Sequence, residues 1–131
     1  MSNTGIITKL SKLSFEETYS KLRSILDNNP NLKILLELDH QANAASVELN
    51  LAPTRIIMFG NPRLGTPLMA SGTLTGLDLP QKILVTERDG TVSISYNDPS
   101  YLKDRHQIKG QDEVLQKVSG ALDKITSMAS E

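Results

Sequence analysis

The sequence of 131 residues predicts a single α+β domain, residues 1–131, in which a largely antiparallel sheet carries helices on one face. Segments with apolar residues at helical spacing alternate along the chain with segments rich in β-branched residues. The pair Asp89-Gly90 separates two strand segments, residues 82–88 and 91–96, and is the pair that a two-residue type I′ turn requires. We therefore expect an antiparallel hairpin within the sheet.

The chain begins with a predicted strand and a predicted helix. Residues 6–10 are rich in β-branched residues, as strands are. Ser14 and Glu17 have the spacing of a capping box, in which each side chain binds the other residue's backbone amide. The apolar face of the helix that follows comprises Phe15, Tyr19, Leu22, Ile25 and Leu26.

Two further strands are predicted before residue 60, with a short helix between them. Residues 32–38 form the first strand, and Asp39 is a candidate N-cap for a helix on which Ala42, Ala45 and Leu49 share a face. Its small alanines would let this helix lie close against a sheet. Residues 55–59 form a strand too apolar to have a solvated face, and it ends at Gly60.

Proline marks the start of two predicted helices in the second half. Asn61-Pro62 places an N-cap before a proline at the first helical position, and Asp98-Pro99 repeats this signal. Pro67 makes the first of these helices either short or irregular. A loop is expected around residues 72–80. The last helix starts near residue 111, and its apolar stripe comprises Val114, Val118, Leu122 and Ile125.

The composition excludes several classes of function. Lys and Arg total 14 against 15 Asp and Glu, so a net charge of -1 gives no field for nucleic acid or anionic lipid. The chain has no cysteine, which excludes disulfides, a thiol nucleophile and thiolate metal ligands. No apolar run approaches the roughly 20 residues of a membrane span. We expect a cytoplasmic domain without a cofactor or bound metal, and with neither nucleic acid nor membrane as a partner.

An ordered set of motifs extends over residues 6–106. Residues 55–69 read RIIMFGNPRLGTPLM, and the surrounding motifs are Asp39-His40, Ala44-Ala45, Asp78-Leu79-Pro80, Asp89-Gly90 and Asp98-Pro99. This set resembles the pattern of the bacterial family called domain of unknown function 302. The resemblance implies a compact α+β domain with a curved antiparallel sheet, in the TATA-binding-protein-like class of folds. It implies no activity.

Polar residues gather at the ends of the predicted elements, where binding groups concentrate on a rigid scaffold. The candidate ligand-binding residues are Asp39, His40, Arg55, Asn61, Asp78 and, as a weaker member, His106. We expect them to share one rim of the sheet. Each also has a local alternative: Asp39 as a helix cap, His40 hydrogen-bonded at a strand end, and Arg55 paired with a carboxylate such as Asp78 or Asp98.

Three classes of function remain open. The favoured one is a domain that binds a polar or anionic small molecule, because of the polar residues at the element ends. The alternative is a homodimeric structural or interaction domain without a ligand, since an exposed hairpin edge strand favours self-pairing. An acid–base enzyme using a His–Asp pair is less favoured, and a metal site lacks the HxH or HxxxH spacing that would support it.

Overall fold

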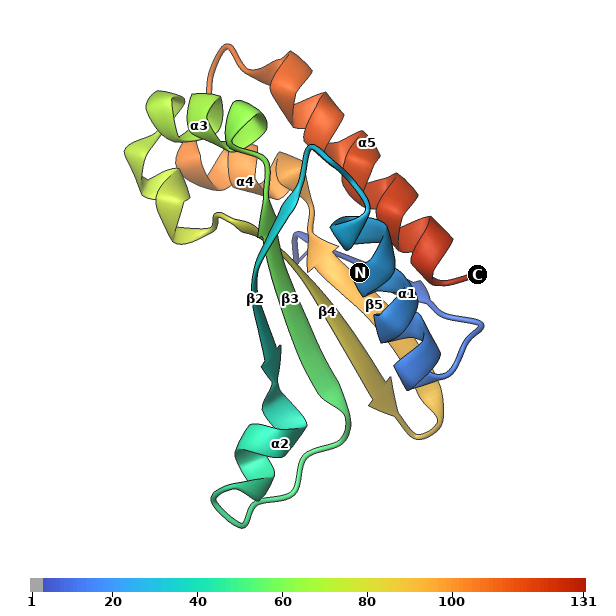
Figure 1. Cartoon of the computed structure of the whole chain (residues 1–131). Coiled ribbons are helices and arrows are strands. Elements are labelled where there is room, and N and C mark those ends of the chain that lie inside the picture. Colours follow the sequence, from blue (N-terminus) through green and yellow to red (C-terminus); the bar gives the residue numbers. More distant parts are fainter. Residues whose placement is uncertain (1–3) are drawn as a thin grey trace.

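The computed structural model describes residues 4–131, in which the strands form one antiparallel sheet in the order β1-β5-β4-β3-β2 (Figure 1). The strands are β1 Ile6–Leu10, β2 Lys33–Asp39, β3 Thr54–Gly60, β4 Gln81–Arg88 and β5 Thr91–Asn97. The helices are α1 Phe15–Asp27, α2 His40–Ala45, α3 Pro62–Ser71, α4 Pro99–His106 and α5 Asp112–Ala129, with a 3₁₀ helix, η1, at Thr73–Leu77.

The predicted hairpin is confirmed, but it lies in the interior of the sheet. Asp89 and Gly90 have φ angles of 52° and 80°, and the paired residues Arg88 and Thr91 bracket this two-residue turn. Since β5 also pairs with β1, and β4 with β3, neither hairpin strand has a free edge. The edge strands of the sheet are instead β1 and β2. The homodimer expected from an exposed hairpin edge therefore loses that basis.

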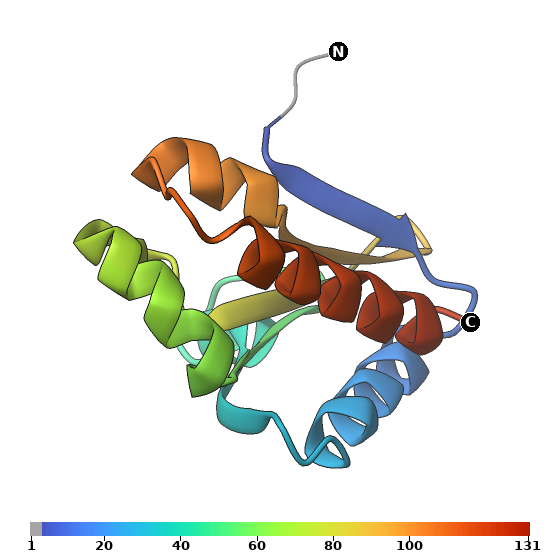
Figure 2. The same cartoon turned by 90° about the horizontal axis from the view of Figure 1, so that it is seen from above.

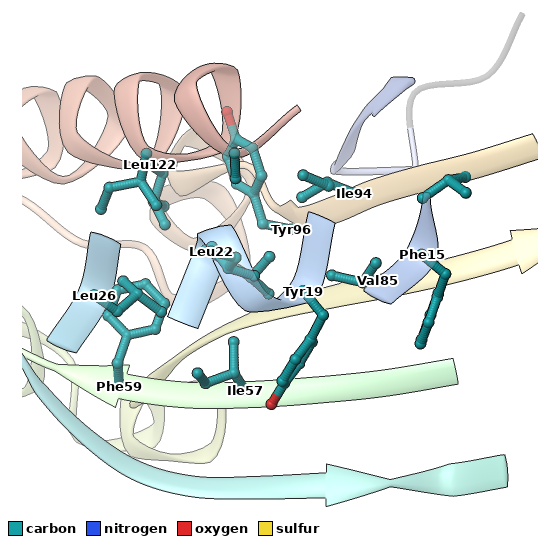
Figure 3. Packing of buried hydrophobic residues seen from close by; sticks show 14 of the residues in the cluster. Phe15, Tyr19, Leu22, Leu26, Ile57, Phe59, Val85, Ile94, Tyr96 and Leu122 are labelled. Atoms are coloured by element: carbon teal, nitrogen blue, oxygen red, sulfur yellow. The ribbon is translucent and has the colours of Figure 1, made fainter. Parts of the chain in front are cut away.

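Helices α1 and α5 lie side by side over one face of the sheet (Figure 2), which confirms the predicted α+β architecture. The capping box of α1 forms as predicted, with Ser14 Oγ accepting from the Glu17 amide at 3.1 Å and Glu17 Oε1 accepting from the Ser14 amide at 3.2 Å. Figure 3 shows Leu22 and Leu26 of α1 packed with Ile57 and Phe59 of β3. The core between sheet and helices is largely aliphatic.

Helix α2 differs from its prediction. It ends at Ala45, none of its residues is buried, and Leu49 lies beyond it with 64% of its surface exposed. The helix follows the end of β2 and projects past the sheet (Figure 1), so its contact with β3 does not bury its alanines. The predicted helix through Leu49, lying against the sheet, is therefore wrong.

Helix α3 begins at the predicted cap and proline and continues through Pro67 to Ser71. Pro67 lacks the amide that would bind the carbonyl of Arg63, and the helix tolerates this loss of one bond. The segment after it, predicted as a loop, contains the 3₁₀ helix η1. With α4, these elements lie beyond one end of the strands (Figure 1).

Within the described residues, no helix layer covers the second face of the sheet. Along β3 the side chains alternate between the two faces, so Ile57 and Phe59 enter the core while Ile56 and Met58 point the other way and are only half-buried. The sequence predicts that β3 has no solvated face. In the single chain, however, the face of β3 that carries Ile56 and Met58 is partly exposed. The apolar residues on it are Leu36, Leu38, Ile56, Met58 and Leu84, here called the open-face patch.

Candidate functional site

An apolar cavity of about 390 Å³ lies where the end of the β2–β3 pair meets α3 and α5. Leu35 and Phe59 line it from the sheet, Leu64 from α3 and Ile125 from α5, and Leu79 precedes β4. Nearly all of the lining surface is apolar. Its volume lies within the roughly 300–1,000 Å³ of small-molecule pockets in proteins.

Two glycines, Gly60 and Gly65, line this cavity. A Cβ at Gly60 would lie 3.6 Å from Pro80 Cβ and 3.8 Å from Leu35 Cδ1. A Cβ at Gly65 would lie 3.8 Å from Leu79 Cδ1, in ordinary van der Waals contact. A methyl group would therefore fit at either position, but larger side chains would extend further into the space between the same neighbours.

The polar side chains that line the cavity are Lys33, Asn61, Thr66 and Gln81. Asn61 Oδ1 accepts from the Arg63 amide at 3.1 Å and so caps α3. Of the six residues singled out from the sequence, Asn61 alone lines this cavity. Among residues 4–131, Lys33 is the one charged residue that lines the cavity.

Arg55 has partners other than those proposed from the sequence. Its guanidinium binds the Glu16 carboxylate at 2.6 and 3.0 Å and Asp39 Oδ2 at 3.3 Å, in place of Asp78 or Asp98. It also lies over the rings of Phe15 and Tyr19, 5.1 and 5.3 Å from their centroids. Glu16 could not be found from the sequence, because it reaches Arg55 only after α1 packs on the sheet.

Asp39 also has the local role that its sequence position indicated. Its Oδ1 accepts from the Ala42 amide at 2.9 Å and caps α2. This backbone hydrogen bond, with the positive charge of Arg55 as a smaller cause, lowers the pKa of the Asp39 carboxyl. The ring of the adjacent His40 has no hydrogen bond within residues 4–131, so its predicted partner at a strand end is not found.

A second polar cluster joins α4 to the segment after η1. His106 Nε2 lies 2.6 Å from Asp78 Oδ2, and Arg105 Nη1 donates to both carboxylate oxygens at 3.1 and 3.2 Å. This is a His–Asp pair of the kind that acid–base catalysis uses. However, the His106 side chain is only 5% exposed, so a substrate has no access to its ring in this conformation.

The six candidate residues therefore do not share one cleft. In the β2–β3 ladder, Asp39 pairs with Arg55 at one end and Lys33 pairs with Gly60 at the other, next to Asn61. The pair of Asp78 and His106 forms a third location. Sequence reasoning missed the cavity, because its aliphatic lining has the pattern of ordinary core; the glycines at positions 60 and 65 were the available signal.

The family model described as domain of unknown function DUF302 matches residues 7–125. The chain belongs to the DUF302 family. A crystal structure titled uncharacterized conserved protein DUF302 from Bacillus stearothermophilus has the same fold, with a TM-score of 0.85 over 97% of this chain and 99% of that one. At 19% sequence identity this likeness concerns the fold. The family membership inferred from residues 55–69 and their neighbours is thus confirmed.

Longer curated proteins contain a similar segment. The fluoride-specific ion channels FluC 1 of Brucella suis biovar 1 (strain 1330) and of Brucella abortus biovar 1 (strain 9-941) are each 36% identical over 107 residues. The match covers 81% of this chain but 42% and 39% of those proteins, so the chain spans about two fifths of their length. Within residues 4–131, no helix has the length and apolarity needed to cross a membrane.

Proposed function

We propose that this DUF302 domain binds an apolar small molecule in the cavity formed by the β2–β3 end, α3 and α5. The observation that supports this most is an apolar cavity of about 390 Å³ with polar groups confined to a few side chains, the usual design of a ligand pocket. The ligand proposed here is apolar, whereas the sequence led us to expect a polar or anionic molecule. Arg55 is paired with Glu16 and Asp39. Asp78 is paired with Arg105 and His106, so these charged groups already have partners within the chain.

The affinity expected for such a ligand is modest. Each methylene transferred from water into an apolar site contributes about 0.8 kcal/mol, so eight of them contribute roughly 6 kcal/mol. That value corresponds to a Kd between about 1 mM and 1 μM. Binding in this range is measurable by fluorescence and calorimetry.

The experiment compares two alanine substitutions. Ala121 lines the cavity from α5 and is exposed, so Ala121→Phe should fill the cavity without disturbing the buried core. Ala70, an exposed residue of α3 that does not line the cavity, provides the matched control Ala70→Phe. With the neutral fluorophore N-phenyl-1-naphthylamine as probe, we expect Ala121→Phe to lose at least about tenfold in affinity and Ala70→Phe to match wild type. Equal affinity for all three proteins would refute the assignment.

The second candidate is self-association through the open-face patch, an interface different from the hairpin edge on which the predicted homodimer was based. The patch is continuous across β2, β3 and β4, since Leu38 pairs with Ile56 and Ile56 with Leu84. Leu36 is 45% exposed and Leu38 37% exposed, so the chain alone leaves aliphatic surface in water. A two-fold interface places one patch against its own copy, so the five uncharged side chains of the patch would meet the same five in the partner.

Light scattering tests this assembly directly. We expect a mass of about twice the 14.4 kDa of the chain at micromolar concentration. Met58→Lys, which places a charge inside the patch, should give the single-chain mass. Leu74→Lys on η1, where Leu74 is 68% exposed and outside the patch, is the matched control and should keep the double mass. A wild-type mass near 14.4 kDa would refute the homodimer.

A further inference from the structure

We infer that the molecule bound in this cavity is an amphiphile with an anionic head group, a carboxylate on an apolar body. This inference rests on the function proposed above and specifies the class of ligand. Its basis is the distribution of charge around the cavity. Lys33 is cationic, and in the described part of the chain no acidic residue lines the cavity. A ligand with an apolar body would fit the apolar lining, and its negative charge would lie beside the cationic Lys33.

The ammonium group of Lys33 is available for such a ligand. Lys9 binds Asp123, and Lys103 binds Asp112, whereas Lys33 has no ion pair or hydrogen bond within residues 4–131. Lys33 is exposed and stands at the first position of β2, opposite Gly60. Its aliphatic stem can lie along the apolar lining while the charged end stays at the solvent-facing mouth.

Neutral donors at the same cavity support the same head group. The side-chain oxygen of Asn61 accepts from the Arg63 amide, which leaves its NH₂ group as the part available to a ligand. Gln81 also lines the cavity, and its side-chain carboxamide has no hydrogen bond within the described residues. A carboxylate accepts hydrogen bonds only, so one cation and two amide donors suit it. An alkylammonium head group would meet Lys33 without a counter-charge.

Isothermal titration calorimetry with three ligands of one chain length separates the alternatives. The ligands are decanoate, decanol and decylamine, each below its aggregation concentration at about pH 7.5. For wild type we expect decanoate to bind about tenfold more tightly than decanol, a ratio that corresponds to about 1.4 kcal/mol, and decylamine to bind most weakly. Lys33→Gln should bring decanoate to the affinity of decanol and leave decanol unchanged. Lys124→Gln, an exposed lysine of α5 that does not line the cavity, should behave as wild type.

The outcomes distinguish the inference from the proposed function beneath it. Equal affinity for decanoate and decanol, or a preference for decanoate that survives Lys33→Gln, overturns the anionic head group while the apolar cavity still binds. Tightest binding of decylamine overturns it as well. Decanoate binding that persists in Ala121→Phe places the binding elsewhere and overturns both proposals, and so does a lack of binding by all three ligands.

Discussion

Replacing Gly90 with valine should destabilise the domain by an amount set by backbone strain alone. Gly90 has a φ of 80°, and a Cβ built on it meets no atom within 4 Å, so a side chain here causes no clash. The remaining cost is that of holding a β-branched residue in the left-handed region, about 1–3 kcal/mol. Since the turn joins β4 and β5 in the middle of the sheet, this cost should appear in global unfolding.

Urea denaturation followed by circular dichroism measures this cost. With a urea m-value of about 2 kcal/mol/M, a loss of about 2 kcal/mol lowers the midpoint by about 1 M. Gly90→Asn is the control, because asparagine tolerates the left-handed region, and it should lower the midpoint much less than Gly90→Val. An unchanged midpoint for Gly90→Val, or equal losses for both variants, would refute the argument from φ.

Two further predictions concern the polar clusters, and both are checked by urea midpoints. Asp78→Ala removes the carboxylate beside the buried His106 ring and should cost about 1–3 kcal/mol, whereas Arg105→Ala, at a half-exposed side chain, should cost less than about 1 kcal/mol. Equal losses would show that burial of His106 is not the cause. Asp39→Ala should cost about 0.5–1 kcal/mol at pH 7 through loss of the α2 cap. Because folding lowers the pKa of Asp39, this contribution is complete above the unfolded value near 3.9 and is lost as pH falls through the folded value, so the difference from wild type should shrink by pH 3. A difference independent of pH would contradict this cause.

Local signals in the sequence predict the elements well, because the interactions behind them span only a few residues. The capping box at Ser14 and Glu17, the cap at Asp39 and the turn at Asp89-Gly90 all form as their spacing indicates. The helix expected to extend through Leu49 fails for a different reason. Its alanines have the spacing of a packing face, but α2 lies past the end of β2, where it touches β3 without burying any of its residues.

The candidate site was predicted less well, because it depends on how distant segments meet. The position of Asn61 at a helix start marks it as a candidate in the sequence, and Asn61 lines the cavity. Arg55 was correctly expected to need a carboxylate, but Glu16 comes from a helix whose position on the sheet the sequence does not reveal. Lys33 was not selected at all. In the sequence it is one lysine in an apolar strand. It becomes a candidate only when the structure places it at the cavity without an ion pair within residues 4–131.

The most direct test of ligand binding in the cavity is a methyl ¹H–¹³C spectrum of the protein titrated with decanoate. Methyl groups that line the cavity, those of Leu64, Leu79 and Ile125, should shift together and saturate with one Kd. The methyl groups of Leu10 and Leu74, which are exposed and outside the cavity, should keep their positions. Shifts confined to Leu36 and Leu38 of the open-face patch, or no shifts at saturating decanoate, would contradict the account.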